Sequence, residues 1–299
     1  MKETIALGCG NFGGVGSAPE FFGQGIPHDE AVALMDRAWA EGIRWFDTAD
    51  AYGGGRSEQW IGEWIAARRE RPVLTTKVFH STNGTPGDTG LAPDRIRRQL
   101  EGSIARLGVD RVDLYLAHEP DSRTPLAETI AVFEELRDEG LIGAWGLSNY
   151  DSGGLREALA HARPALVQNS FSLLDQDPTL ELCRAERIRY VPFGPLAGGW
   201  LTGKYARGAP FPEGSRMTQR PAPYEGYVDD RVFDGLDRLR AEAAERGVDM
   251  AALAFAWVLA CCDGAVCGPM RADHLDPVLE ARELELTPDD VERIGGLFA

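Results

Sequence analysis

The sequence predicts an α/β protein, a (β/α)8 TIM barrel of eight parallel strands surrounded by helices, formed as a single domain by residues 1–299. Eight short apolar segments recur along the chain, as is typical of strands covered on both faces. Segments with helical periodicity, such as 29–42, 93–108 and 125–140, separate them. Parallel strands require crossovers of a dozen or more residues, which these helical segments supply. A barrel of about 250 residues is commonly one unit.

The predicted strands are short and rich in β-branched and aromatic residues. In chain order they are Ile5–Cys9, Ile43–Thr48, Val73–Phe79, Val112–His118, Ile142–Ser148, Ala165–Phe171, Ile188–Phe193 and Gly264–Gly268.

Several predicted helices carry boundary signals. Thr124 followed by Pro125 is typical of an N-cap and a first helical residue, and Thr287 with Asp290 resembles a capping box. The apolar segment 251–262 is predicted as a buried helix, since it is too short to span a membrane, which takes about 20 apolar residues.

A doubly wound open sheet is the competing architecture. Its first strand would lead into a G-x-G-x-x-G loop and a helix, and residues 8–13 match that bare pattern. However, Gly14, Gly16 and Pro19 follow, so no helix can begin at the third glycine. The barrel is therefore preferred.

Composition excludes some classes of function. With 31 basic and 47 acidic residues, the net charge is −16, which disfavours binding to nucleic acid or to anionic lipid. The first residues, MKETIALG, do not resemble a signal peptide, and no stretch is apolar enough for a membrane helix. The five cysteines are odd in number and form no C-x-x-C pair, so we expect free thiols in a reducing cytoplasm.

Polar residues end three neighbouring predicted strands. Asp47 and Tyr52 follow the second strand, Lys77 lies near the end of the third, and His118 ends the fourth. These side chains are expected at the C-terminal rim of the barrel, where such folds place their active sites. Taken singly, a histidine such as His118 is more often structural; the four together indicate a catalytic set.

The same segments resemble the aldo-keto reductase superfamily. The matching motifs are FDTADAYGGGRSE, TTKV, RVDLYLAHEPD, WGLSNY and PLAGGWLTGKY, and they run from Leu7 to about Gly268 in the expected order. The resemblance implies reduction of an aldehyde or ketone by hydride transfer from a nicotinamide cofactor.

The residue types fit that chemistry. A tyrosine titrates near 10, so a neighbouring cation is needed to favour its phenolate and lower its pKa. Lys77 is expected to be that cation and Asp47 its ion-pair partner, with Tyr52 as the general acid. His118 is expected to bond the carbonyl oxygen of the substrate and to help orient the proton.

The resemblance also assigns cofactor contacts. Ser148, Asn149 and Gln168 match the residues that bind the nicotinamide carboxamide, although turn chemistry also accounts for Ser148 and Asn149. Phe193 stands where the family commonly has a tyrosine stacked on the nicotinamide ring, and the phenyl ring preserves the stacking. The loop expected to wrap the pyrophosphate contains Gly194, Pro195, Leu196, Gly198 and Lys204.

The adenosine end matches the family less well. It is expected to involve Gly268, Met270, Arg271 and His274. Arg271 is a candidate partner for a 2′-phosphate, because its guanidinium suits phosphate geometry, and it is equally consistent with a solvated helix start. On this basis NADPH is favoured over NADH.

An apolar wall is predicted around the mouth, suited to a substrate with a hydrophobic body. Its residues are Phe12, Phe21, Phe22, Phe79 and Trp200.

Two alternative functions stay open: an NAD(P)-dependent sugar or alcohol dehydrogenase, and a slow-turnover cofactor-binding sensor or subunit of the same fold. The five histidines show no metal-ligand spacing, so no metal is expected.

Overall fold

The computed structural model describes residues 4–298 and contains eight parallel strands in one sheet. The strands lie in the order β7-β6-β5-β4-β3-β2-β1-β8. Backbone bonds from Val266 N to Pro192 O (2.8 Å) and from Asp263 N to Tyr190 O (3.0 Å) link the β8 and β7 segments. The predicted (β/α)8 architecture is thus confirmed. The strands are β1 Ile5–Gly8, β2 Trp45–Asp47, β3 Val73–Val78, β4 Val112–Ala117, β5 Ile142–Ser148, β6 Leu166–Gln168, β7 Arg189–Tyr190 and β8 Ala265–Cys267.

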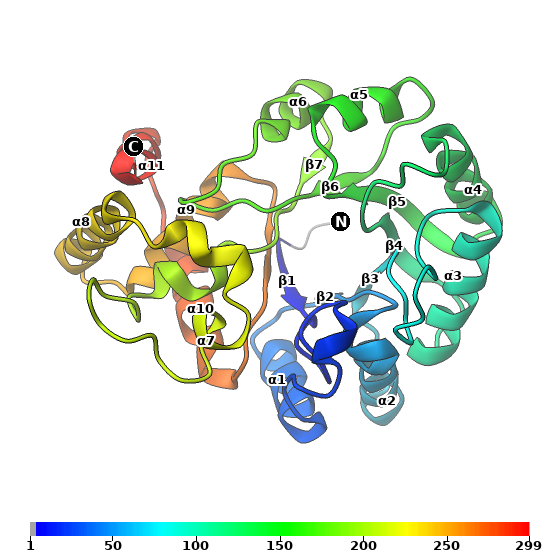
Figure 1. Cartoon of the computed structure of the whole chain (residues 1–299), viewed down its shortest axis with the longest axis horizontal. Coiled ribbons are helices and arrows are strands. Elements are labelled where there is room, and N and C mark those ends of the chain that lie inside the picture. The colour runs from blue at the N-terminus through cyan, green and yellow to red at the C-terminus, as the bar shows by residue number, and fades with distance from the viewer. Residues whose placement is uncertain (1–3, 299) are drawn as a thin grey trace.

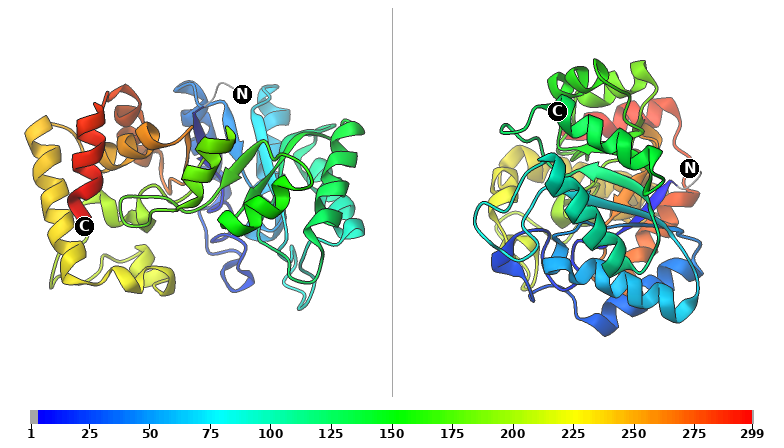
Figure 2. Two further views of the ribbon diagram at one scale, coloured as in Figure 1. Left: turned by 90° about the horizontal axis from the view of Figure 1, so that it is seen from above. Right: turned by 90° about the vertical axis from the view of Figure 1, so that its right-hand side faces the viewer.

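Helices surround the strands (Figure 1). Figure 2 shows α8 and α11 together at one side of the molecule, opposite α3 and α4. The helices are α1 His28–Ala40, α2 Arg56–Arg68, α3 Pro93–Leu107, α4 Leu126–Asp138, α5 Ser152–Leu159, α6 Thr179–Glu186, α7 Arg216–Gln219, α8 Asp230–Arg246, α9 Met250–Cys261, α10 Asp276–Glu283 and α11 Pro288–Gly295.

Seven of the eight strands are shorter at their C-terminal ends than the sequence predicts. The residues beyond each ladder turn into the loops of the C-terminal rim and present their side chains there. Lys77 still lies within β3, whereas Tyr52 and His118 lie just beyond β2 and β4. The ladder ends where the candidate site begins.

The barrel interior is filled by its own small cluster of buried residues: Ala6, Trp45, Leu114, Leu116, Leu166, Val191 and Val266. Trp45 satisfies its indole N–H by donating to Thr75 Oγ1 at 2.7 Å. A larger cluster packs the outer faces of the strands against the helices. The interior is therefore a packed core that supports the rim rather than a channel.

The two long loops of the rim are partly ordered by local structure. A bridge between Phe12 and Ile26 closes the loop after β1, and the loop after β7 contains α7 and the 3-10 turn Ala222–Tyr227.

The capping box of Thr287 and Asp290 is confirmed. The expected N-cap at Thr124 is wrong: Pro125 is the N-cap of α4, and the Thr124 hydroxyl donates to Asp121 Oδ2 instead.

Helix α9 is the predicted buried helix, since all nine residues from Met250 to Val258 are buried. A fully buried helix start must satisfy its free N–H groups with side chains. Asp249 Oδ1 accepts from Ala251 N at 2.7 Å and from Ala252 N at 3.4 Å. This carboxylate therefore anchors α9 at its N-terminus.

Asp249→Ala should lower the free energy of unfolding by about 1 kcal/mol, because two amides lose their acceptor. Urea denaturation measures the change. Asp249→Ser, which keeps a capping oxygen, is the control and should lose less than half as much. Equal losses in the two variants would contradict a capping role for this side chain.

Candidate active site

Tyr52 is presented by a tight glycine turn after β2. Gly53, Gly54 and Gly55 have φ of 60°, 70° and 87°, a left-handed conformation that side chains rarely adopt. The turn is tied to α2 and β1, because Ser57 Oγ bonds Thr48 Oγ1 at 2.7 Å and donates to the carbonyl of Cys9 at 3.0 Å. The run of three glycines in the sequence therefore positions the candidate acid.

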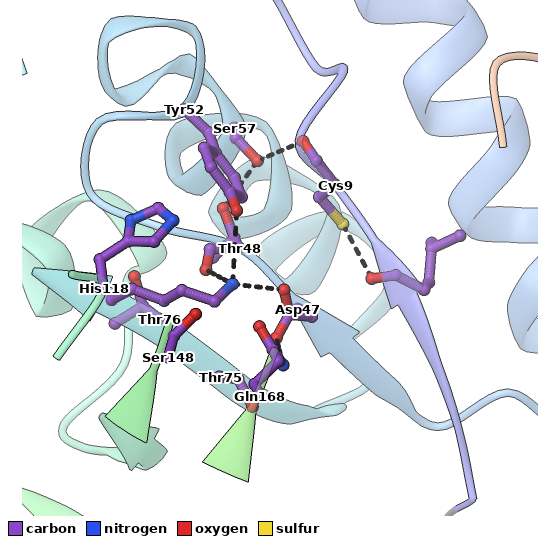
Figure 3. Close-up of polar contacts among 12 residues, drawn as sticks. Cys9, Asp47, Thr48, Tyr52, Ser57, Thr75, Thr76, His118, Ser148 and Gln168 are labelled. Atoms are coloured by element: carbon purple, nitrogen blue, oxygen red, sulfur yellow. Dashed lines mark hydrogen bonds and ion pairs between the residues drawn. The ribbon is translucent and has the colours of Figure 1, made fainter. Parts of the chain in front are cut away.

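Lys77 is buried beneath Tyr52 and held by several oxygens. Its Nζ lies 2.5 Å from Asp47 Oδ1, 2.9 Å from the carbonyl of Thr48 and 3.5 Å from Tyr52 Oη. Figure 3 shows Asp47, Tyr52 and Gln168 gathered around this contact. Burial alone would lower the pKa of Lys77, but Asp47 and Tyr52 raise it above its ordinary value. Lys77 is thus a fixed ammonium cation.

The expectation that Lys77 lowers the pKa of Tyr52 below its ordinary value is wrong. Burial is the largest single cause and raises the pKa of Tyr52, Lys77 lowers it, and Asp47 and Cys9 raise it, so the net shift is upward. Tyr52 therefore stays protonated at neutral pH. Lys77 nevertheless favours the ionised form of Tyr52, because its charge and its hydrogen bond both lower that pKa.

His118 is a neutral imidazole beside Tyr52. The two rings meet edge to face, with centroids 5.6 Å apart. Burial, Lys77 and His80 lower the pKa of His118 well below its ordinary value. Its Nδ1 is buried and has no hydrogen-bond partner among the described residues. A neutral imidazole can donate one hydrogen bond to a carbonyl oxygen without carrying charge.

Two of the predicted carboxamide-binding residues belong to the same network. Gln168 is buried and its Nε2 donates to Asp47 Oδ2 at 2.9 Å. Asn149, at φ 62°, donates from Nδ2 to the carbonyl of His118 at 2.9 Å and to Glu119 Oε1 at 3.1 Å. Ser148 is buried at the end of β5. All three lie at the rim beside the catalytic candidates, and their role toward a cofactor stays a prediction.

The predicted pyrophosphate loop follows β7. Phe193 packs partly buried against the interior cluster, and Gly194 has φ 70°. A side chain at Gly198, φ 63°, would collide with the ring of Tyr224. Pro195 and Leu196 lie between these glycines, and Leu196 closes the turn by accepting from Gly199 N at 2.8 Å. Gly194 leaves this turn without a side chain, whereas the space beside Gly198 is filled by Tyr224.

A cluster of cations flanks that loop. Burial lowers the pKa of Lys204, and the positive charges of Arg216 and Arg271 lower it further, so the three cations contribute to one positive potential beside the loop. Arg271 is exposed and its guanidinium is engaged by Asp273 at 2.8 and 3.0 Å. His274 Nδ1 accepts from Met270 N at 3.2 Å, which links the two ends of the segment 270–274.

Arg216 is a site residue that the sequence did not reveal. Its Nη2 donates to Asn11 Oδ1 at 2.5 Å, and its Nη1 is buried with no hydrogen-bond partner among the described residues. Burial lowers the pKa of Arg216. Arg216 lies in a loop of Gly, Pro and polar residues, so no periodicity or motif singled it out. A buried guanidinium nitrogen without a partner is a donor suited to an anionic ligand.

The predicted apolar wall is partly wrong. Phe12 and Trp200 are fully buried in the core between strands and helices and cannot line the mouth. Phe21, Phe22 and Phe79 are half-buried and stay available. Two polar residues that the sequence did not single out, His80 and Glu119, are half-exposed beside His118.

Residues 4–298 contain no group of three or more His, Cys, Asp or Glu side chains arranged to hold a metal ion. Over the same range, no helix combines the length and the apolar character needed to cross a membrane.

Comparison with known proteins identifies the family. A sequence model of the Aldo/keto reductase family matches residues 4–298. The chain is 34% identical over 298 residues to an uncharacterized oxidoreductase of Bacillus subtilis, covering 92% of this chain and 89% of that protein. It is 31% identical over 270 residues to an NADH-specific methylglyoxal reductase of Escherichia coli, covering 85% and 81%. The chain therefore belongs to the aldo/keto reductase family.

A solved structure supports the assignment. The glycerol dehydrogenase of Gluconobacter oxydans superposes with a TM-score of 0.83 at 26% identity, covering 98% of this chain and 90% of that one. The family consists of oxidoreductases that use nicotinamide cofactors, and carbonyl reduction is the general reaction assigned to this chain.

A second buried carboxyl lies beneath the site. Asp50 is fully buried, and neither carboxyl oxygen has a hydrogen-bond partner among the described residues. Burial and the nearby Glu58 raise the pKa of Asp50 well above its ordinary value. Glu58, by contrast, accepts from Thr76 Oγ1 at 2.5 Å and from Arg106 Nε at 2.8 Å.

Asp50→Asn should stabilise the protein more at pH 8 than at pH 4. Between the ordinary pKa and the raised one, the folded chain keeps a proton that the unfolded chain has lost, so the free energy of unfolding falls as pH rises. The wild type loses about 1.4 kcal/mol of unfolding free energy for each pH unit between the two pKa values. The Asn side chain does not titrate, so the variant does not lose this stability. Thermal unfolding across this pH range measures it, with the exposed Glu213→Gln as control. A gain that does not grow with pH would contradict a protonated Asp50.

Proposed function

We propose that the chain is an NADP(H)-dependent reductase of aldehydes or ketones with Tyr52 as the general acid. The observation that supports it most is the contact of Tyr52 Oη with Lys77 Nζ at 3.5 Å, with Lys77 itself held by Asp47 at 2.5 Å. Neutral His118 lies against the same tyrosine. Five unpaired cysteines agree with a reducing cytoplasm as the place of action.

The proton chemistry follows from the charges. Tyr52 begins as a neutral phenol, and its Oη gives a proton to the oxygen of the reduced carbonyl. Lys77 stabilises the phenolate left behind, and Asp47 keeps the ammonium in position. His118 offers an imidazole N–H to the carbonyl oxygen, which polarises the carbonyl and orients it toward Tyr52. A bound nicotinamide cofactor supplies the hydride.

Residues for that cofactor fit its polar groups. Ser148, Asn149 and Gln168 offer amide and hydroxyl groups for a carboxamide, and Phe193 offers a ring face. At Gly194 the backbone carries no side chain, and among the described residues only Ser170 Oγ lies near the space that a Cβ would fill, which leaves room for a phosphate. Lys204 and Arg216 supply positive charge against a net charge of −16.

The preference for NADPH rests on Arg216 and its neighbours. Arg216 has a buried donor without a partner among the described residues, and Lys204 and Arg271 lie close by. Such a cluster suits an additional phosphate better than a ribose hydroxyl. Gly268, Met270, Arg271 and His274 are assigned to the adenosine end on the same grounds.

Tyr52→Phe should lower kcat for aldehyde reduction at least about 100-fold, because only the proton donor is lost. Cofactor affinity, measured by quenching of tryptophan fluorescence, should change less than about threefold. The assay follows NADPH oxidation with a panel of aldehydes. A Tyr52→Phe variant that retains most of its turnover would be incompatible with Tyr52 as the acid.

Arg216→Ala should weaken NADPH binding by about 10- to 100-fold and NADH binding much less, because a charge-assisted bond to the 2′-phosphate is lost. Titration calorimetry with both cofactors measures it. Arg207→Ala, which removes an exposed arginine of the same loop paired with Asp234, is the control and should leave both affinities unchanged. Equal weakening of both cofactors would assign Arg216 to a shared part of the dinucleotide.

A further inference from the structure

The row of rings that begins at Tyr52 continues past His118. The His80 ring meets the His118 ring edge to face, with centroids 4.9 Å apart, as His118 meets Tyr52 at 5.6 Å. Glu119 follows, since its Oε1 lies 3.9 Å from His80 Nε2. Tyr52, His118 and His80 are therefore neighbours ring against ring, and Glu119 lies beside the partly exposed His80.

His80 and Glu119 are fixed in place and still accessible. Their side chains are 31% and 36% exposed. Arg95 Nη2 donates to the carbonyl of His80 at 2.8 Å, and the Phe79 ring packs edge-on against its imidazole. Glu119 Oε1 accepts from Asn149 Nδ2 at 3.1 Å, while Oε2 has no hydrogen-bond partner within residues 4–298. The pair thus offers an oriented carboxylate oxygen with a free acceptor site.

The charge at this edge is negative. Burial and Arg95 lower the pKa of His80, so its imidazole is neutral at pH 7. Arg95 is itself buried, and its guanidinium bonds the carbonyls of His80, Asp88 and Gly90. A carboxylate beside a neutral imidazole binds hydroxyl donors and repels anions.

The observed wall of the mouth agrees with a polar ligand. Phe12 and Trp200, expected to make this wall apolar, are buried in the core instead. Phe79 serves as the support of His80. The surface next to His118 is therefore more polar than the sequence predicts.

Resting on the reductase function proposed above, we propose that His80 and Glu119 are specificity-determining residues that bind a hydroxyl group of the substrate. The preferred substrates are then hydroxylated aldehydes or ketones, in preference to apolar aldehydes and to carbonyl compounds that carry a carboxylate.

The test compares kcat/KM for three aldehydes at pH 8 with saturating cofactor. Half-burial raises the pKa of Glu119, and pH 8 keeps the carboxylate ionised. Glyceraldehyde and propanal share a three-carbon skeleton and differ in their hydroxyls, while succinic semialdehyde carries a carboxylate. The wild type should favour glyceraldehyde over propanal by about tenfold or more, the worth of one hydrogen bond to a charged group.

Two substitutions of Glu119 separate its acceptor from its charge. Glu119→Leu should reduce kcat/KM for glyceraldehyde about tenfold and for propanal less than about threefold. Glu119→Gln keeps the acceptor toward Asn149 and should raise kcat/KM for succinic semialdehyde about tenfold. Glu157→Gln neutralises an exposed carboxylate on α5 and should leave all substrate ratios unchanged. Using ratios cancels any loss of folded enzyme.

The outcomes separate this proposal from the function on which it rests. Reduction of propanal as efficient as that of glyceraldehyde, or equal losses for both in Glu119→Leu, would overturn the role of Glu119 and leave the reductase intact. Failure of the wild type to oxidise NADPH or NADH with any of the three aldehydes would overturn the reductase function, and this proposal with it.

Discussion

The buried ion pair of Lys77 and Asp47 is the constraint on which the rest of the site depends. Placing two charges in a protein interior costs several kcal/mol per ion unless each is surrounded by matching groups. Here the ammonium bonds Asp47, the carbonyl of Thr48 and Tyr52, and the second oxygen of Asp47 accepts from Gln168. These contacts fix the ends of β2, β3 and β6 relative to one another, so the geometry of the candidate site depends on the packing of three strands.

Basic and acidic side chains occupy different parts of the rim, a distribution that the net charge does not reveal. The chain carries −16 overall, yet Lys204, Arg216 and Arg271 gather on the side of the pyrophosphate loop. His118 is kept neutral between Lys77 and His80, and Glu119 carries the negative charge at the opposite edge. The cations follow β7 and β8, and Glu119 follows β4, so the electrostatic potential differs between the two sides of the rim.

Three of the four catalytic candidates, Asp47, Lys77 and His118, were predictable because they lie at or next to the end of a strand whose apolar pattern is strong. In a parallel barrel, all strand ends face the same rim, so sequence position alone brings Asp47, Lys77 and His118 together. The direction in which a pKa is shifted is harder to predict from sequence. The expectation for Tyr52 counted the charge of Lys77 but not the burial of the phenol, and burial is the larger effect.

The barrel, the capping box at Thr287 and the four catalytic candidates could be predicted from the sequence, because they depend on local periodicity and on motifs of adjacent residues. Tertiary structure alone decided which loop side chains reach the site. Arg216 meets Asn11 across 205 positions, Glu119 meets Asn149, and Phe12 and Trp200 turn into the core. Loop conformation is set by packing between distant segments, and no local pattern in the sequence records those contacts.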